Sequence, residues 1–272
     1  MNILISVDIE GVAGVYHAQQ VRAGNPEYER ARRWMTDEAN AAIAGAIDGG
    51  ARTIYVNDSH GDFRNLLPEA LDARAQVIQG KPRYLGMAAG VELGVDGMCM
   101  VGYHARAQAA GILAHTINSF AFAGIEINGR ELGEAGLYAA LAGEHGVPVI
   151  MASGDDAFIG ETQPLLPHAT FVQTKRATGQ TSGISLPPAQ ACAAIHAGVK
   201  ASLARLAQAR LFVLEGPLAV TLRTQTPALA DLFCQWPAFE RRGGCTLAFS
   251  APTVEVAVRM LNCCSAMSAL LR

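Results

Sequence analysis

The stretch Asn2-Ile-Leu-Ile-Ser-Val-Asp8-Ile-Glu10-Gly11 is an apolar run that ends in two carboxylates one residue apart. The run is short, rich in branched side chains and followed by glycines, so a strand is favoured over a helix. It has too few polar positions for a half-exposed strand, which is typical of a central strand in a parallel sheet. The sequence therefore predicts an α/β fold built around this strand.

The two carboxylates are the first candidate for a functional group. Side chains two residues apart on a strand point to the same side, so Asp8 and Glu10 face one cavity if the strand continues to its end. Two anions held together in a partly dry place repel each other unless they are protonated or bridged by a cation. A metal ion meets that requirement. The alternative is that Asp8 starts a turn and Glu10 is solvated.

Length and composition restrict the class of protein. The chain has 272 residues, which suits one large domain or two of ordinary size. Half of the residues are hydrophobic and 17% are charged, as in a globular protein. The net charge is -3 and the only lysines are Lys81, Lys175 and Lys200, so the composition argues against a nucleic-acid partner.

The sequence also bears on the cellular compartment. The first residues lack the charged region and small-residue cleavage site of a signal peptide, and no apolar stretch stands out as long enough to span a bilayer. We therefore expect a cytoplasmic protein without a membrane segment. The six cysteines form no C-x-x-C pair, so neither a zinc ribbon nor a redox motif is predicted, and reduced thiols are expected.

Strand and helix patterns alternate through the first part of the chain. Asn25-Pro26 is typical of a helix start, and apolar residues at helical spacing follow until Gly49-Gly50. A strand is predicted at 53–56, and this strand, helix and strand form a parallel crossover unit. Further elements are predicted in the same way: strands at 97–101 and 149–151, a hairpin turn at Asn128-Gly129 and an amphipathic helix over 133–145.

The alternation becomes looser after about residue 155. An alanine-rich helix is predicted to end near 209, and shorter strands and helices follow it to the end of the chain. We therefore predict a metal-binding α/β domain over 1–155 with a mainly parallel, doubly wound sheet. A smaller mixed α/β domain over 156–272 is expected to pack on it.

Three predicted strands end at side chains that can bind metals. Asp8 and Glu10 follow the first strand, His60 follows the second and His104 follows the strand at 97–101. The carboxyl ends of parallel strands share one edge, where ligands bind in such folds. Each histidine alone could simply be hydrogen-bonded at a strand end. Together with the two carboxylates they predict a metal site at this edge.

Other titratable residues carry weaker signals. Glu134 lies in the first turn of a predicted helix, where the helix dipole favours a carboxylate in any case. His115 follows a short apolar run and is either a packed strand residue or a functional one. Asp58, Asp155 and Asp156 are interpreted as turn acids or acids that support the ligands from behind. Surface or structural roles are expected for the remaining histidines: His17, His145, His168 and His196.

Separated blocks of sequence resemble one known family. The resemblance is to the zinc D-aminopeptidases of the DppA type, from bacterial dipeptide-transport operons, and it runs through most of the chain. The blocks that carry it stand in the family's order: Ser6-Val-Asp8-Ile-Glu10-Gly11, Val56-Asn-Asp-Ser-His60, Gly102-Tyr-His104-Ala-Arg106, His115 and Gly133-Glu134-Ala-Gly.

The resemblance implies a dinuclear zinc site with two zinc ions per chain. By motif position, Asp8 would bridge the ions, Glu10 and Glu134 would complete one of them, and His60 and His104 the other. His115 would be the catalytic group, as a base, an acid or an oxyanion donor. The resemblance further implies a homo-oligomer of pentameric rings stacked into a decamer.

One departure from the family pattern concerns the substrate. Gln180 stands where a second basic residue after Lys175 is expected. This difference bears on how the substrate is anchored, and it leaves the expected metal ligands unchanged.

The function that follows is a metal-dependent aminopeptidase. It would hydrolyse the N-terminal amide bond of short peptides by a metal-bridging hydroxide, and the preference for D-amino acids comes from the resemblance alone. Carboxylate and imidazole ligands suit zinc, with manganese or cobalt as alternatives. Two other functions remain open on the sequence alone: a two-metal phosphoesterase and a non-catalytic cytosolic peptide-binding protein.

Overall fold

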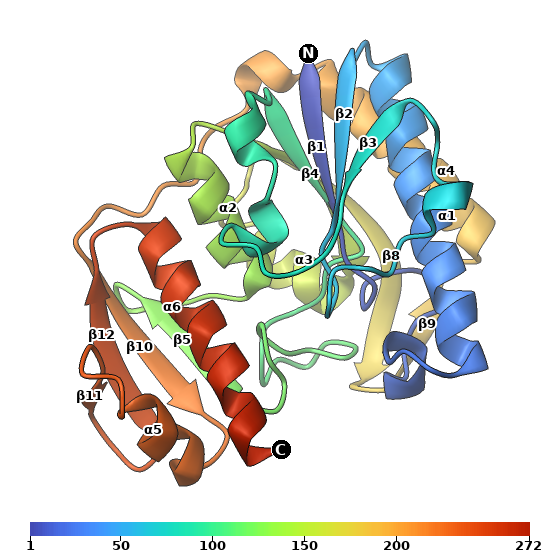
Figure 1. The fold of residues 1–272 in the computed structure, drawn as a ribbon. Helices are drawn as coiled ribbons and strands as arrows, with labels where there is room; N and C mark the ends of the chain where they lie inside the picture. The colour runs from blue at the N-terminus through green and yellow to red at the C-terminus, as the bar shows by residue number, and fades with distance from the viewer.

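The computed structural model describes residues 1–272 and contains two sheets (Figure 1). All strands of the large sheet are parallel except the last, which is antiparallel to its neighbour. This confirms the predicted α/β class with a mainly parallel sheet. The strand order is β3 (Ala75–Ile78), β2 (Thr53–Asp58), β1 (Asn2–Val7), β4 (Gly97–Val101), β7 (Val149–Asp155), β8 (Thr170–Gly179) and β9 (Ser182–Ser185).

Strand β1 is buried on both faces, as its apolar sequence predicts. Ile3, Ile5 and Val7 belong to a core shared with helices α1 (Pro26–Asp48) and α4 (Pro188–Leu203), which pack against each other. Leu4 points to the opposite face and joins a core with α2 (Glu134–Glu144). Alternate residues of one strand thus support two hydrophobic cores, and helices cover both faces of the sheet.

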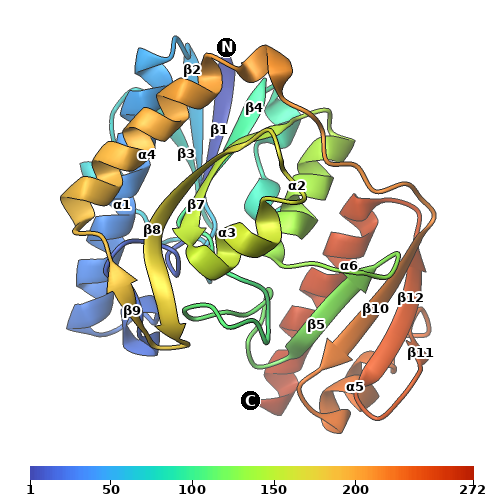
Figure 2. The ribbon, with the colours of Figure 1, turned by 180° about the vertical axis from the view of Figure 1, so that it is seen from behind.

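The small sheet is antiparallel and lies beside the large one (Figure 2). Asn128 and Gly129, both with positive φ, connect two of its strands, so the predicted hairpin turn is confirmed. Helix α6 (Val254–Met267) packs on this sheet, as does the short α5 (Pro227–Phe233). The strand order is β11 (Glu240–Arg241), β12 (Thr246–Ala251), β10 (Leu218–Thr224), β5 (Phe122–Ile127) and β6 (Arg130–Glu131).

The remaining elements are short. Helix α3 (Asp156–Thr162) follows β7 directly, and the Asp155 carboxylate caps it by accepting from the amide of Phe158 at 2.8 Å. The connecting loops contain turns of 3-10 helix: η1 (Ala18–Val21), η2 (Pro68–Ala70), η3 (Gly86–Ala88), η4 (Val91–Leu93), η5 (Leu206–Gln208) and η6 (Ser268–Leu271).

The two sheets do not divide the chain at residue 155. Strands β8 and β9 extend the large sheet beyond that position, while β5 and β6 lie before it and belong to the small sheet. The physical reason is long-range pairing. β8 pairs directly with β7, and the β5–β6 hairpin extends the edge of β10. Periodicity within a segment does not encode such partners.

Two predicted properties of helices differ in the structure. Helix α2 is buried from Glu134 to Gly143 and is not amphipathic, because it lies between the large sheet and α6. The segment Val254–Leu271 is long and apolar enough to cross a membrane by length and composition, contrary to the expectation that no such stretch exists. Its residues Val258 and Leu261 lie in the core under the small sheet, and a core helix passes the same test.

The loop after β1 is held from several sides. The buried Lys175 of β8 donates from its ammonium to the carbonyl oxygens of Glu10 and of Val15, the latter at 2.6 Å. Thr174 Oγ1 donates to Gly11 O at 2.7 Å. From α1, the buried Glu38 carboxylate accepts from the amide of Ala13 at 2.8 Å. The sheet and α1 together therefore fix the segment that carries Glu10.

Gly11 is the point of closest approach in this loop. Its amide donates to Gly102 O at 2.7 Å, and a Cβ atom at position 11 would overlap the carbonyl oxygen of Tyr103. Backbone atoms cannot move aside as a flexible side chain can. We expect Gly11→Ala to lower the free energy of unfolding by about 3 kcal/mol or more, measured by chemical denaturation.

The matched control is Gly160→Ala, because a Cβ atom added there would meet no other atom within 4 Å and the residue lies in α3. It should change stability by no more than about 1 kcal/mol, in the stabilising direction. Equal effects of the two substitutions would contradict the close approach at Gly11.

Glu38 gives a pH-dependent prediction. Burial raises the pKa of its carboxyl to about 7, against the opposing effects of the Ala13 amide and the Lys175 ammonium. A raised folded pKa means that the folded state holds the proton more tightly than the unfolded state. The stability that Glu38 contributes to the folded state is therefore fully present below its unfolded-state pKa of 4.5. It is lost as the pH rises through its folded-state pKa of about 7.

Between pH 4.5 and pH 8, the wild type should lose about 3 kcal/mol more unfolding free energy than Glu38→Gln, which has no carboxyl group to ionise at this position. Unfolding free energies measured across this range give the difference between the two proteins. Glu27→Gln, an exposed change in the same helix, serves as the control and should parallel the wild type. Parallel curves for the wild type and Glu38→Gln would refute the prediction.

Candidate metal centre

The candidate site lies at the carboxyl edge of the large sheet, where the strand order reverses. The strand after β1 along the chain, β2, pairs on one side of it, and β4 pairs on the other. Val7 is in register with Asp58 and with Val101, so the three strands end at the same level. Ligands bind at such a reversal in open α/β sheets, and the predicted edge is therefore the one observed.

Asp8 and Glu10 approach each other by a route that differs from the prediction. The strand stops at Val7 and does not continue to Glu10. Asp8 Oδ1 accepts from the amide of Ile9 at 2.8 Å, and a turn at this point brings Glu10 to the same cavity. Both carboxylates are buried, so the interpretation of Glu10 as a solvated residue is wrong.

His60 faces both of these carboxylates. Its Nε2 donates to Val21 O at 2.9 Å, because a carbonyl oxygen only accepts. Its Nδ1 lies 3.3 Å from Asp8 Oδ1 and 3.0 Å from Glu10 Oε2. In neutral His60, therefore, Nδ1 is the nitrogen that carries a lone pair toward the carboxylates.

His104 repeats this arrangement from the neighbouring strand. Its Nδ1 donates to Ala105 O at 2.9 Å, which leaves Nε2 as the lone-pair nitrogen. Nε2 lies 3.3 Å from Asp8 Oδ2 and 3.5 Å from Glu134 Oε1. The two oxygens of Asp8 thus face two different histidines.

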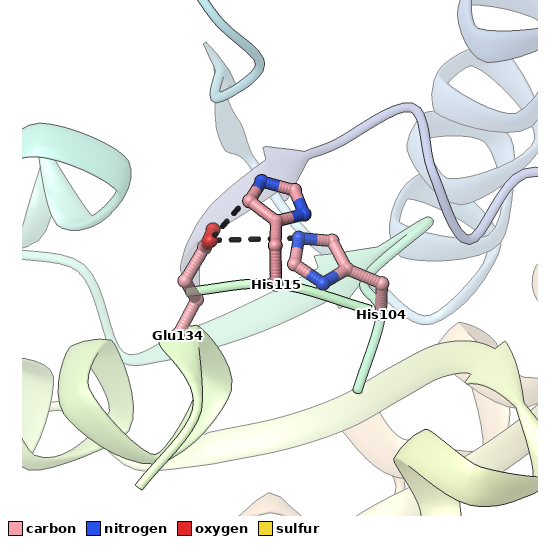
Figure 3. A group of neighbouring side chains, drawn as sticks. All are labelled: His104, His115 and Glu134. Carbon is pink, nitrogen blue, oxygen red and sulfur yellow. Dashed lines mark ion pairs between the residues drawn. The ribbon is translucent and has the colours of Figure 1, made fainter. Parts of the chain in front are cut away.

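His115 and Glu134 complete the group (Figure 3). Glu134 is the first residue of α2, and its Oε1 also accepts from the amide of Ile117 at 2.6 Å. His115 Nδ1 donates to Leu113 O at 3.0 Å, and Nε2 lies 3.6 Å from Glu134 Oε1. The rings of His104 and His115 are stacked, with centroids 4.1 Å apart. All six predicted site residues therefore lie together.

The donor atoms of this group fit metal ions. The lone-pair nitrogens of three histidines point at carboxylate oxygens, an arrangement that is repulsive without a proton or a cation between them. Glu10 Oε2 and His104 Nε2 are buried and have no hydrogen-bond partner. His104 also lies within ligand distance of two sets, one with Asp8 and Glu10 and one with His115 and Glu134. Imidazole and carboxylate donors of this kind are typical of zinc sites.

The electrostatics of the protein alone favour positive charge at this place. Burial lowers the pKa of His60 and of His104, but the neighbouring carboxylates outweigh it and hold both values well above the usual 6.5. Burial raises the pKa of Asp8 and of Glu134, and the imidazoles more than offset it, so both values are lowered. The group is therefore a buried anionic cluster in need of cations.

A cavity of about 850 Å³ opens onto the cluster. Asp8, Glu10, His60, His115 and Glu134 line it. Loops from the large sheet form part of its wall, and the end of α6 with η6 forms another part. The volume is within the range of small-molecule sites, so a short peptide fits.

The acids interpreted as supporting residues lie behind the site. Asp58 accepts from the amides of Asn65 and Leu66 and orders the loop after His60. Asp155 accepts from the amide of Ile112 at 2.7 Å, in the segment before His115. Three of the other histidines bond elsewhere: His17 caps η1, and His145 and His196 lie beside Glu255 and Asp48.

Sequence reasoning missed the role of Lys175. Its ammonium is buried and occupied by two carbonyl oxygens, so it holds the Glu10 loop and is not a substrate anchor. Burial lowers its pKa to about 8. Gln180 does line the cavity, and its carbonyl accepts from the amide of Leu113 at 2.8 Å. The sequence around Lys175, between Thr174 and Arg176, gives no signal for a buried role.

Comparisons with known proteins agree with this geometry. The sequence model of the D-aminopeptidase family, peptidase family M55, matches residues 1–263. The D-aminopeptidase of Bacillus subtilis (strain 168) is 38% identical over 191 residues, which cover 70% of this chain and 69% of that protein.

A solved structure is also similar, that of the Zn-dependent D-aminopeptidase DppA from Bacillus subtilis, described as a self-compartmentalizing protease. It matches with a TM-score of 0.95 and 29% identity, over 99% of this chain and 98% of that one. The resemblance carried by the sequence motifs is thereby confirmed. Because the family model spans nearly its whole length, this chain belongs to the D-aminopeptidase family, peptidase family M55.

Proposed function

We propose that this chain is a zinc-dependent aminopeptidase that removes the N-terminal residue, a D-amino acid, from short peptides. The observation that carries the proposal is the convergence of three lone-pair nitrogens on three buried carboxylates at the base of a peptide-sized cavity. The D-aminopeptidase family and the zinc dependence of the related DppA structure support it. The same family membership disfavours the phosphoesterase and the binding protein.

The distances divide the ligands into two sets that share Asp8. Glu10 lies with His60 at 3.0 Å, and Glu134 lies with His104 at 3.5 Å. We therefore assign two zinc sites per chain: Asp8, Glu10 and His60 would hold one ion, and Asp8, His104 and Glu134 would hold the other. This division differs from the one that motif position implied, in which the two glutamates shared an ion.

Bound zinc supplies Lewis-acid polarisation of a carbonyl oxygen and a water of lowered pKa. The residues of the chain do the rest. The carbonyl oxygens of Val21 and Ala105 fix the ring orientations of His60 and His104, so that their free nitrogens stay aimed at the centre. The amide of Ile117 holds Glu134 in the same way. Little reorganisation is then needed when substrate binds.

His115 is the group that we assign to proton transfer. Its Nδ1 is fixed as a donor by Leu113 O, so Nε2 accepts a proton and can deliver it to the leaving amine. Its side chain is one-fifth exposed and lines the cavity, whereas that of His104 is 1% exposed. A substrate in the cavity can therefore contact His115 directly, whereas His104 is buried behind the cavity wall.

Assembly and location are part of the proposal. We infer a homo-oligomer, because the similar DppA structure is described as self-compartmentalizing. The finer arrangement that we propose, pentameric rings stacked into a decamer, comes from the sequence resemblance alone. A cytoplasmic location is also proposed. Mass measurement under native conditions and fractionation of cells test these two statements.

Metal content tests the shared ligand. Protein purified without chelator should hold about two zinc ions per chain, measured by elemental analysis. Asp8→Asn should lose most of the zinc at both sites, because the Asp8 carboxylate lies beside both His60 and His104. Asp62→Asn, an exposed acid on the same cavity wall, is the control and should retain both ions. Retention of two ions by Asp8→Asn would overturn the assignment.

The same preparations test the reaction. Zinc-loaded wild type should hydrolyse a D-alanyl dipeptide, and chelation should abolish the activity until zinc is restored. Hydrolysis of neither the D- nor the L-dipeptide would refute the proposed function. Turnover of an aryl phosphate in its place would indicate a phosphoesterase, and tight binding of peptide without turnover a binding protein.

His115 gives a prediction that separates a catalytic role from a ligand role. We expect His115→Gln to keep about two zinc ions per chain and to lower kcat by about 10²- to 10⁴-fold. KM for the D-dipeptide should change much less. A fall to one zinc ion per chain would instead show that His115 is a ligand, since it lies close to Glu134 and His104.

A further inference from the structure

The cavity has a strongly cationic wall outside the ligand cluster. Apart from Asp8, Glu10 and Glu134, its charged lining consists of one carboxylate, Asp62, and five cations. The whole chain has a net charge of -3, so this concentration is local. The five are Arg22, Arg64, Lys81, Arg83 and Arg272.

Three of these cations already have partners. Arg83 donates to Asp58 O at 2.6 Å and to Ile78 O at 3.2 Å, and it stacks on the Phe63 ring. Lys81 lies 3.8 Å from Asp62. Arg272 lies over the Phe120 ring, at 5.1 Å from its centroid. A substrate anion would have to compete with these contacts for the three side chains.

Arg22 and Arg64 are different. Both are exposed in the cavity wall, and neither guanidinium makes a hydrogen bond or an ion pair. Unpaired guanidinium groups in a cavity are available for a planar anion such as a carboxylate.

Both arginines are adjacent in sequence to residues that contact His60. Val21, the neighbour of Arg22, accepts from His60 Nε2 through its carbonyl. Asn65, the neighbour of Arg64, donates from Nδ2 to His60 O at 2.7 Å. Two separate loops that contact His60 therefore each contribute one arginine to the wall of the cavity that His60 also lines.

We infer that Arg22 and Arg64 bind the C-terminal carboxylate of the peptide substrate. The inference rests on the proposed function, because an aminopeptidase must place the N-terminal residue at the metal ligands. In a dipeptide the carboxylate then lies one residue beyond the scissile bond, at most about 3.6 Å farther along an extended chain. Arg22 and Arg64 line the cavity into which this carboxylate extends, on loops that contact His60. The enzyme is therefore specific for short peptides with a free carboxyl terminus.

The test compares D-alanyl-D-alanine with its C-terminal amide. Zinc-loaded wild type should prefer the free dipeptide about ten-fold or more in kcat/KM, since hydrogen bonds to a charged group are among the strongest in proteins. The double variant Arg22→Gln/Arg64→Gln should lose this preference, mainly through a higher KM for the free dipeptide. Its activity on the amide should stay within about two-fold of the wild type, which shows that the fold and the metal centre are intact.

Arg30→Gln is the matched control, because Arg30 is an exposed arginine outside the cavity, and the single variant should keep the preference. Equal hydrolysis of dipeptide and amide by the wild type would overturn the carboxylate site and leave the aminopeptidase function standing. An equal loss on both substrates in the double variant would also overturn it. Hydrolysis of neither substrate by the wild type would instead remove the proposed function, and the carboxylate site with it.

Discussion

Three carboxylates buried within contact distance of three imidazole nitrogens are the constraint on which the rest of this structure depends. Asp8, Glu10 and Glu134 are each less than 5% exposed, so water cannot screen their charges. Cations must offset them, either as protons on the histidines or as metal ions. The backbone carbonyls that hold one nitrogen of each ring decide which nitrogen faces the carboxylates. The site is therefore arranged for metal ions by the main chain as much as by the ligands.

The strands explain why these groups can be held so closely. The ends of β1, β2 and β4 lie in register, and tight backbone contacts join their loops, as between Gly11 and Gly102. Lys175 and Glu38 then fix the Glu10 loop from β8 and α1. Both are buried ionisable groups, and the charged form of each costs stability that an apolar residue would not. The residues that hold Glu10 in position for metal binding therefore lower the stability of the folded state.

The sequence predicted the parallel sheet and the edge at which Asp8, Glu10, His60 and His104 meet, because strand ends can be recognised from local patterns. Glu134 and His115 could be assigned only through resemblance to a family, since a glutamate at a helix start has a structural explanation too. The membership of β5 and β8 in particular sheets depends on pairing between distant segments. The role of Lys175 depends on where β8 lies in the sheet, and no local pattern reports that.

The small sheet contributes to the site without supplying a metal ligand. Its helix α6 ends at the cavity, and Ser265 Oγ accepts from Asn118 Nδ2 at 2.9 Å, in the loop that also carries His115. That loop contains Leu113 and Ile117, both with positive φ, and such residues keep this conformation only when their surroundings enforce it. Packing of α6 against the loop is one such enforcement. The large sheet therefore fixes the ligands, while the small sheet helps to fix His115 and shapes the cavity that receives the peptide.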